Sequence, residues 1–408
     1  MHKQKRVIWS VVIAIGFLLF SYCMTNLDFP VSGEKALLYR FELVRNYLIP
    51  RENTVNDSTL LIDVSFDKTP VKATDEYGMP IGDIQITDRK KLLKLLQELK
   101  KRNDYKYILL DVFFGQKGET PQDSVLFATI CSMPRIVIPC HSDEALADSS
   151  LMEKAGRADY TTTYKESSFV KYPYMSDDGM SLPLKMFEDM TGRTIRKHCV
   201  IYTDGLRLVR KSIVLTFDIY ANSSYNEEGE KVWYYLGADI LGNKDERGLL
   251  YEIPDLTKDK YIAIGAFQGD DSHSTYIGSV CGTLINLNAY FSLLHNHHVV
   301  SISLVIVMFF AFFVLAYLTL TRQDLRGLAD SMTQKHSYRW RTRMMTLSAL
   351  CSWIGYSLFL TILCIMTFVF LGEVYEIFIT STMFYLLSLA VKYTDNFKKI
   401  SKLWKRKG

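Results

Sequence analysis

The sequence predicts an α/β domain, built on a largely parallel central sheet with flanking helices, that is attached to four transmembrane α-helices. Two observations carry this prediction. Short apolar segments of strand length alternate with segments of helical periodicity, which is typical of parallel sheets with right-handed crossovers. In addition, one apolar run near the N-terminus and three in the C-terminal part each approach or exceed the roughly 18 residues that a membrane-spanning helix needs.

The strands of the sheet are expected at short apolar runs rich in β-branched and aromatic residues. The clearest runs are LLIDVSF at 60–66, YILLDVFF at 107–114, RIVIP at 135–139 and YIAIGA at 261–266. A further strand is expected at 213–219. Helices are expected at 34–47, 89–99, 123–132 and 181–191, and either Thr87 or Asp88 can cap the second of these.

The stretch after the last strand connects the domain to the membrane. Its apolar residues recur at helical spacing and predict an amphipathic helix; they are Val280, Leu284, Leu287, Phe291 and Leu294. An unbroken apolar run follows within a few residues. We therefore expect a shift of the helix at 286–294 to be passed directly to a transmembrane helix.

The basic residues orient the four transmembrane helices, which are expected at 7–25, 299–321, 347–371 and 374–391. Lys and Arg gather in the segments 1–6, 322–346 and 392–408, whereas none occurs from Tyr261 to Thr321. The positive-inside rule then places both termini and the loop in the cytoplasm and the domain at 26–298 outside it.

The first apolar run has a second interpretation, as a cleaved signal peptide. Ser21-Tyr22-Cys23 places a bulky tyrosine where a signal peptidase requires a small residue, so an uncleaved anchor is favoured. Four cysteines, Cys131, Cys140, Cys199 and Cys281, fall in the outer domain. Their scattered positions favour small buried residues, although pairing of Cys131 with Cys140 stays open.

These residues resemble the CHASE2 domain of bacterial membrane receptors. The likeness is carried by LLIDVSFD, by the turn and helix at 82–99, by YILLDVFFG, by the SDDG turn at 176–179 and by the closing pattern IGAFQGDDSHSTYIGSVCGTLINLNAYFSLL. The order of one span before the domain and three after it is also similar. Two departures stand out, because Tyr276 follows Thr275 where the family often has proline, and the segment 143–255 matches poorly.

The resemblance implies an extracytoplasmic sensory domain in a bacterial inner membrane. Such domains usually precede a cytoplasmic output enzyme, but about seventeen residues follow the fourth span here. We therefore expect a sensor without enzymatic activity that detects an unknown small-molecule ligand or an envelope state and signals to a separate partner protein. Pairing of two copies through the membrane helices stays open, and the net charge of +4 in 408 residues gives no reason to expect a nucleic-acid partner.

Acidic residues at the ends of the predicted strands are the candidate ligand-binding residues. Asp63 and Asp111 are expected in neighbouring strands, whose carboxyl ends face the crevice where ligands bind in parallel sheets. The remaining candidates are Asp67, Asp270, Asp271 and Thr275. The competing interpretation is that these side chains cap helices and brace loops. A structural or transmitting role is expected for four further residues, which are Gly265, Gly278, Gly282 and Asn288.

No metal ligand or cofactor is assigned from the sequence. His273 with His295, His297 and His298 does not have the spacing of a recognised metal site. Two alternative functions remain beside the sensor. One is a scaffold or subunit of an envelope membrane complex, and the other is a metal-dependent envelope hydrolase that uses the aspartate cluster.

Overall fold

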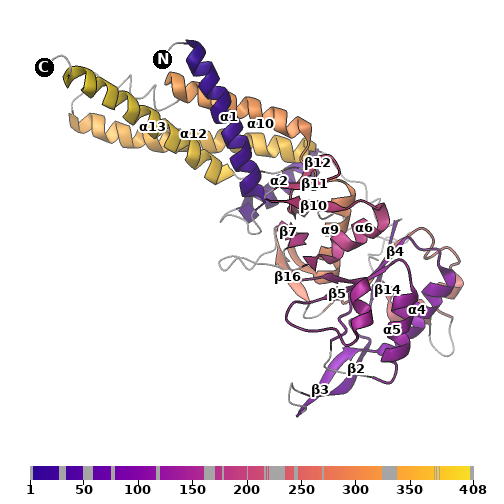
Figure 1. Cartoon of the computed structure of the whole chain (residues 1–408). Coiled ribbons are helices and arrows are strands. Elements are labelled where there is room, and N and C mark those ends of the chain that lie inside the picture. Colours follow the sequence, from indigo (N-terminus) through magenta and orange to yellow (C-terminus); the bar gives the residue numbers. More distant parts are fainter. Residues whose placement is uncertain are drawn as a thin grey trace. The chain divides into compact units, whose positions relative to one another are not determined.

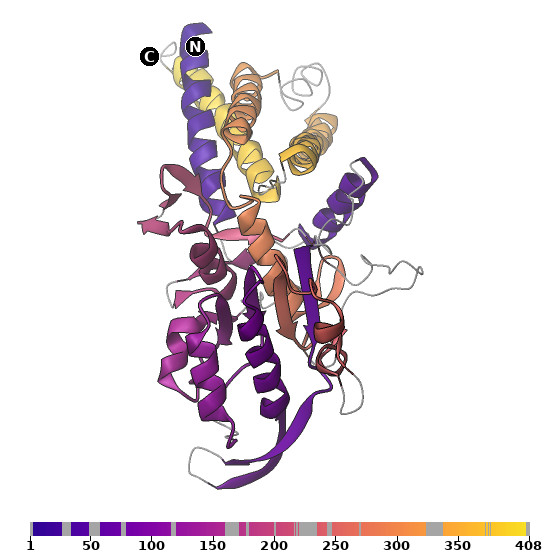
Figure 2. The same ribbon diagram turned by 90° about the vertical axis from the view of Figure 1, so that its right-hand side faces the viewer.

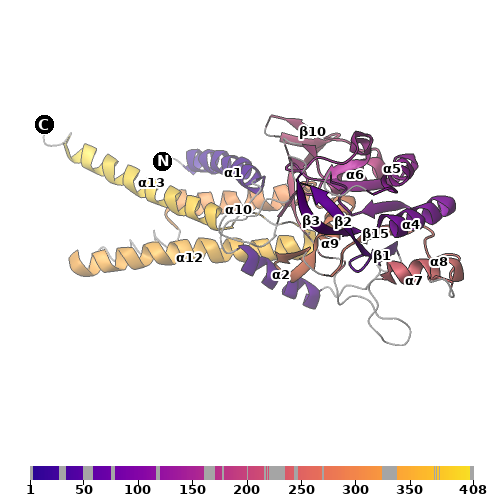
Figure 3. The same cartoon turned by 90° about the horizontal axis from the view of Figure 1, so that it is seen from below.

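The computed structural model forms two compact units (Figures 1, 2 and 3). A helical unit comprises residues 1–27, 41–49 and 300–408, and an α/β unit comprises 28–40 and 50–299. The residues described are 3–26, 34–48, 58–74, 79–115, 120–159, 171–176, 179–199, 201–215, 217, 219, 235–242, 247–268, 271–323, 338–371, 373, 375 and 377–404.

The helical unit contains four helices that are long and apolar enough to cross a membrane. They are α1 (Lys3–Thr25), α10 (Ile302–Thr321), α12 (Tyr338–Leu371) and α13 (Ile377–Trp404). α1 packs along α10, and α12 packs along α13. The ring of Phe17 in α1 stacks on the ring of Phe384 in α13, with the two centroids 4.0 Å apart. All four predicted helices are confirmed, and the chain has the character of a multi-pass membrane protein.

The α/β unit is built on a six-stranded sheet in the order β14-β1-β15-β4-β5-β6, and every strand pair in it is parallel. The strands are β1 (Thr59–Asp63), β4 (Tyr107–Leu110), β5 (Ile136–Cys140), β6 (Ala155–Arg157), β14 (Tyr235–Leu236) and β15 (Tyr261–Gly265). All residues of β1, β4 and β15 are buried. This is the pattern of a parallel sheet that is covered by helices on both faces.

Two helical layers cover the sheet. One contains α4 (Arg89–Arg102), α5 (Asp123–Ser132), α7 (Gly237–Leu241) and α8 (Leu249–Glu252), whose apolar side chains form one core with alternate residues of the strands. The other contains α6 (Leu182–Thr191) and α9 (Gly282–Leu294). Tyr107 of β4 donates a hydrogen bond to Asp189 of α6, and the ring of Tyr261 in β15 packs on that of Tyr290 in α9.

Helix caps explain where two of these helices begin. The carboxylate of Asp88 accepts hydrogen bonds from the backbone nitrogens of Lys90 and Lys91, so Asp88 rather than Thr87 caps α4. The hydroxyl of Ser181 accepts from the nitrogen of Leu184 at the start of α6. The helix α2 (Glu34–Leu48) also forms where its periodicity predicts it.

Short strands outside the central sheet form small antiparallel ladders. They are β2 (Lys68–Thr74) with β3 (Pro80–Thr87), β7 (Lys171–Pro173) with β13 (Ser212–Val214), β8 (Met175–Ser176) with β9 (Gly179–Met180), β10 (Ile195–His198) with β11 (Ile201–Asp204) and β12 (Arg207–Val209), and β16 (Ser272–Thr275) with β17 (Gly278–Cys281). A 3₁₀ helix, η1 (Ser149–Lys154), precedes β6.

Three predictions need correction. β15 lies between β1 and β4, so Asp63 and Asp111 are not on neighbouring strands. Of the described residues in the strand expected at 213–219, only Ile213 and Val214 lie in a strand, β13, which pairs with β7 outside the central sheet. α9 is not amphipathic, because every residue from Gly282 to Leu293 is buried. Its polar side chains are directed into the protein rather than into solvent.

None of the seven cysteines forms a disulfide in this structure. Cys131 and Cys140, the pair considered from the sequence, are not bonded to each other. Cys131 contacts the carbonyl oxygen and the hydroxyl of Ser150, at 3.5 Å and 3.6 Å. Of the four cysteines expected to be small buried residues, Cys281 is buried, Cys131 and Cys140 are partly buried, and Cys199 is exposed.

Candidate functional site

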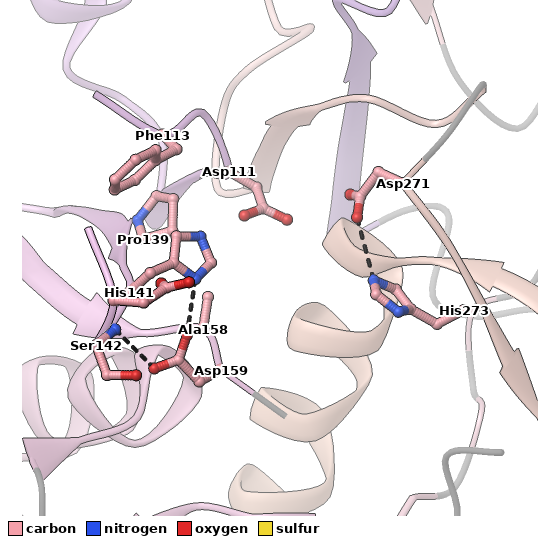
Figure 4. Close-up of a pocket in the computed structure, with 10 residues that line it drawn as sticks. Asp111, Phe113, Pro139, His141, Ser142, Ala158, Asp159, Asp271 and His273 are labelled. Atoms are coloured by element: carbon pink, nitrogen blue, oxygen red, sulfur yellow. Dashed lines mark hydrogen bonds and ion pairs between the residues drawn. The ribbon is translucent and has the colours of Figure 1, made fainter. Parts of the chain in front are cut away.

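A pocket of about 600 Å³ lies outside the carboxyl ends of β4, β5 and β6 (Figure 4). It is lined by Asp111, Phe113, Pro139, His141, Ser142, Asp143, Ala158, Asp159, Asp271 and His273. Three successive strands of the sheet therefore supply most of its wall, and the start of the β16–β17 hairpin supplies the rest. This is the edge of an open parallel sheet at which ligands are generally bound.

Asp111 lies at the centre of the pocket. Its backbone nitrogen donates to the carbonyl oxygen of Ile264, 2.7 Å away, which fixes the residue at the end of β4 against β15. The carboxylate is directed into the space between His141 and Asp271 (Figure 4). Burial, followed by the negative charge of Asp271, raises the pKa of Asp111 to about 6. The side chain therefore exchanges its proton close to neutral pH.

Two buried side chains of α9 face Asp111 from the protein side. They are Thr283, which is fully buried, and Asn286, which is 1% exposed. Both lower the pKa of Asp111 as donors, yet the Thr283 hydroxyl and the Asn286 amide nitrogen complete no hydrogen bond of normal geometry with any described residue. The oxygen of the Asn286 amide accepts a hydrogen bond of 2.9 Å from the hydroxyl of Tyr172, which orients the amide.

His141 and Asp159 form one wall of the pocket. Nδ1 of His141 lies 2.8 Å from a carboxylate oxygen of Asp159, whose other oxygen accepts from Arg157 at 2.8 Å and from the nitrogen of Ser142 at 2.9 Å. Burial would raise the pKa of Asp159, but the hydrogen bonds from Arg157, His141 and Ser142 outweigh it and lower the pKa to about 2. Asp159 is thus ionised and holds the imidazole in place.

Asp271 and His273 form the opposite wall. Nε2 of His273 lies 3.1 Å from a carboxylate oxygen of Asp271. The backbone carbonyl of Asp271 accepts a hydrogen bond of 3.2 Å from the nitrogen of Gly282, the first residue of α9. This wall of the pocket is therefore attached to the start of the helix that also carries Thr283 and Asn286.

The side chains that line this pocket are mainly suited to accept hydrogen bonds from a ligand. Among the described residues, its lining contains four carboxylates and two imidazoles but no lysine or arginine. Within the described part of the chain, no three His, Cys, Asp or Glu side chains converge as the ligands of a metal ion do.

Of the predicted ligand-binding residues, Asp111 and Asp271 meet in this pocket. Asp63 and Asp67 lie elsewhere. The Asp63 carboxylate is 1% exposed and accepts from the backbone nitrogens of Ser65 and Phe267, at 2.9 Å and 3.1 Å, so it braces the loops after β1 and β15. Asp67 forms an ion pair of 2.6 Å with Lys91. For these two residues the competing, structural interpretation is the one that fits.

Thr275 has a local role in the β16–β17 hairpin. Its hydroxyl donates to the carbonyl of Gly278, 2.7 Å away, and accepts from the nitrogen of Ile277, 3.2 Å away. Gly278 has a φ of +124°, a conformation that glycine adopts without strain. These contacts close the turn and leave Thr275 outside the pocket lining. Asp270 lies outside the described residues.

Of the residues predicted to be structural, Gly265 lies where β15 meets α9, and Gly282 and Asn288 belong to α9 itself. A Cβ atom on Gly265 would lie 2.1 Å from the Thr283 hydroxyl, so glycine permits this close packing. The side chain of Asn288 accepts from the nitrogen of Ile219 (3.0 Å) and donates to its carbonyl (2.9 Å). Gly282 begins α9.

Sequence reasoning missed His141, Asp143 and Asp159. A signal was present, because the letters CHSD follow the apolar run RIVIP directly and therefore fall at the carboxyl edge of the sheet. Asp159 had no such signal, since β6 is a strand of only three residues.

Comparisons with family models, with curated proteins and with solved structures find no match to this chain. The likeness to CHASE2 domains therefore depends on the sequence segments quoted above.

Proposed function

We propose that this protein is a membrane-anchored receptor whose α/β unit binds a small molecule in the pocket around Asp111. The observation that carries the proposal is the composition of the pocket wall. It combines side chains at the carboxyl edge of a parallel sheet with a hairpin whose Asp271 is hydrogen-bonded to the first residue of α9. A ligand that contacts Asp271 thus contacts a residue that is hydrogen-bonded to the first residue of α9, and a ligand on Asp111 contacts a carboxylate that two side chains of α9 face.

The route from pocket to membrane in this proposal is short. α9 ends at Leu294 and α10, a candidate membrane span, begins at Ile302. A ligand shifts a conformational equilibrium only by the difference between its affinities for the two states. In the proposal this difference arises at Asp111, because the α9 donors Thr283 and Asn286 act on its carboxylate without hydrogen bonds of normal geometry.

The location in the proposal is a bacterial inner membrane with the α/β unit outside the cytoplasm. The support is the distribution of Lys and Arg, which gather in the terminal segments and in the loop at 322–346 but are absent from Tyr261 to Thr321. The resemblance to CHASE2 domains points the same way. The output of the receptor would then be a separate partner protein on the cytoplasmic side or within the membrane.

The proposal is tested by purifying the tagged full-length protein from its native membranes in mild detergent and identifying the proteins recovered with it by mass spectrometry. The wild type is compared with Ser142→Trp, which fills the pocket from an exposed lining position, and with Ser149→Trp, an exposed position outside the lining. A receptor predicts a kinase, cyclase or transcription regulator in fixed ratio, whose activity changes with Ser142→Trp alone.

Two results would contradict the receptor. Recovery of envelope-building or transport proteins in equal amounts from all three forms would favour a scaffold that uses the α/β unit for docking. Turnover of an envelope substrate by the purified protein, lost with Asp111→Asn, would favour a hydrolase.

A further inference from the structure

The charge of the pocket determines which class of ligand it can hold. Asp159 is already occupied by Arg157, His141 and the backbone of Ser142. Three further carboxylates line the pocket, from Asp111, Asp143 and Asp271, and none of the described residues that line it is a lysine or an arginine. A cleft lined by charges of one sign concentrates ligands of the opposite sign.

A second, independent observation lies beneath Asp111. Buried polar groups in folded proteins are nearly always hydrogen-bonded. The hydroxyl of Thr283 and the amide nitrogen of Asn286 are buried and act on Asp111 as donors, but neither makes a hydrogen bond of normal geometry with a described residue. Two donors on the protein side of a carboxylate favour its ionised form. A cation on the pocket side would favour the same form, and both donors could then close onto it.

The size and lining of the pocket separate an organic cation from a metal ion. A volume of about 600 Å³ exceeds what a bare ion fills, and the described acidic and histidine side chains do not converge as a metal's ligands do. The ring of Phe113 also lines the pocket and is packed edge-on against His141 at 4.9 Å. An aromatic face beside carboxylates suits an alkylammonium or a guanidinium group.

We propose that the pocket binds a small organic cation, an amine or a guanidinium compound, with its charged group on Asp111 and Asp271. This inference rests on the proposed receptor function and names the ligand class of the same site. The bound cation further favours the ionised form of Asp111, toward which Thr283 and Asn286 donate from the protein side. Stronger hydrogen bonds from Thr283 and Asn286 to Asp111 would hold α9 more tightly against the end of β4.

The test uses full-length protein in detergent and three probes with the same four-carbon chain, which are 1,4-diaminobutane, 1,4-butanediol and succinate. Binding is measured by ligand-observed NMR at pH 7.5 and constant ionic strength, because salt screens exposed charges. The expected order is diamine at least about tenfold tighter than diol, with no binding of succinate. Asp111→Asn should weaken the diamine by about tenfold or more, and Asp271→Asn should weaken it less.

The control variant is Asp83→Asn, which removes an exposed carboxylate on β3 outside the pocket lining and should leave diamine binding unchanged. Thermal unfolding of each variant shows whether it is folded. If Asp111→Asn is not folded, the loss of diamine binding in Asp271→Asn tests the proposal instead. Absence of diamine binding, equal binding of the diol, tighter binding of succinate, or displacement of the diamine by an equal concentration of MgCl₂ would each overturn the proposal. The receptor itself would stand or fall separately, because its test with Ser142→Trp uses no added ligand.

Discussion

Asp111 is a carboxylate whose ionisation opposes folding. Its pKa is raised from the ordinary value of 3.8 to about 6 by burial and by Asp271, and it is also faced by His141, Tyr172 and Cys281. The folded state therefore binds the proton more tightly than the unfolded state does, so this residue's contribution to stability is present below pH 4 and is lost as pH rises through 6.

Replacing Asp111 by Asn should remove that pH dependence. Relative to wild type, Asp111→Asn is expected to gain stability as pH rises from about 4 to about 7, by no more than about 3 kcal/mol, and to gain nothing below pH 4. Thermal unfolding of the two proteins at several pH values measures the difference. A constant difference at all pH values would show that Asp111 does not titrate as described.

Replacing Asp63 should lower the stability of the protein, whereas replacing Asp111 should raise it at neutral pH. The reason is that a carboxylate oxygen of Asp63 accepts hydrogen bonds from the backbone of Ser65 and Phe267. Asp63→Ala removes the acceptor of these two backbone hydrogen bonds and is expected to cost about 1–3 kcal/mol of the free energy of unfolding. Chemical denaturation at pH 7.5, with the exposed Asp83→Ala as the control, measures the loss. Equal stability of Asp63→Ala and wild type would remove its role as a brace.

Gly265 tests how closely β15 and α9 approach each other. In Gly265→Ala, the new methyl group would meet the Thr283 hydroxyl 2.1 Å away, and overpacking of this kind costs about 1–3 kcal/mol. Adding Thr283→Ala removes the nearest atom and should recover part of the stability. The two single variants and the double variant, compared by thermal unfolding, form the test. Strictly additive losses would mean that the two residues do not meet.

At the scale of elements, α9 is the helix to which both the pocket and the sheet are attached. Asn288 fixes its middle to Ile219 through both the backbone nitrogen and the backbone carbonyl of that residue. Asn288→Ala should therefore cost about 1–3 kcal/mol and speed hydrogen exchange along α9. Ser279→Ala, at an exposed position of β17, is the matched control. Unchanged exchange along α9 in Asn288→Ala would contradict this assignment.

The sequence predicts an element well where one physical signal dominates. Continuous apolar runs identified β1, β4, β5 and β15, and heavily apolar segments of 18 residues or more identified the membrane spans. The spacing of apolar residues wrongly predicted that α9 is amphipathic. Its polar residues are hydrogen-bonded inside the protein, as Asn288 is to the backbone of Ile219. Strand order could not be predicted, since β15 pairs with β1 and β4 from far along the chain.

The candidate site shows the same limit. Asp111 and Asp271 could be chosen as candidate ligand-binding residues because each comes soon after an apolar run that is recognisable as a strand. Asp63 was chosen by the same rule, but its carboxylate accepts from the backbone of Ser65 and Phe267, and only the position of such neighbours distinguishes a brace from a ligand. His141 and Asp159 are 18 residues apart and meet because β5 pairs with β6. This pairing could not be predicted from the sequence.

At the scale of the whole molecule, the proposed topology predicts which cysteine is reached from outside the cell. Cys199 is exposed in the α/β unit. A membrane-impermeant maleimide applied to intact spheroplasts is expected to label wild-type protein, and Cys199→Ser should lose that label. A cysteine introduced by Ser401→Cys, beyond the last span, should react only after lysis. Labelling of Ser401→Cys in intact spheroplasts, or of Cys199 only after lysis, would reverse the topology.

The central claim is that the state of the pocket is transmitted to α9, and hydrogen exchange of the full-length protein tests it most directly. Exchange is followed by mass spectrometry in wild type, in the pocket-filling Ser142→Trp and in the control Ser149→Trp. The account predicts that Ser142→Trp changes exchange across Gly282–Leu294 severalfold, while Ser149→Trp leaves it as in wild type. Identical exchange along α9 in all three proteins would contradict the claim.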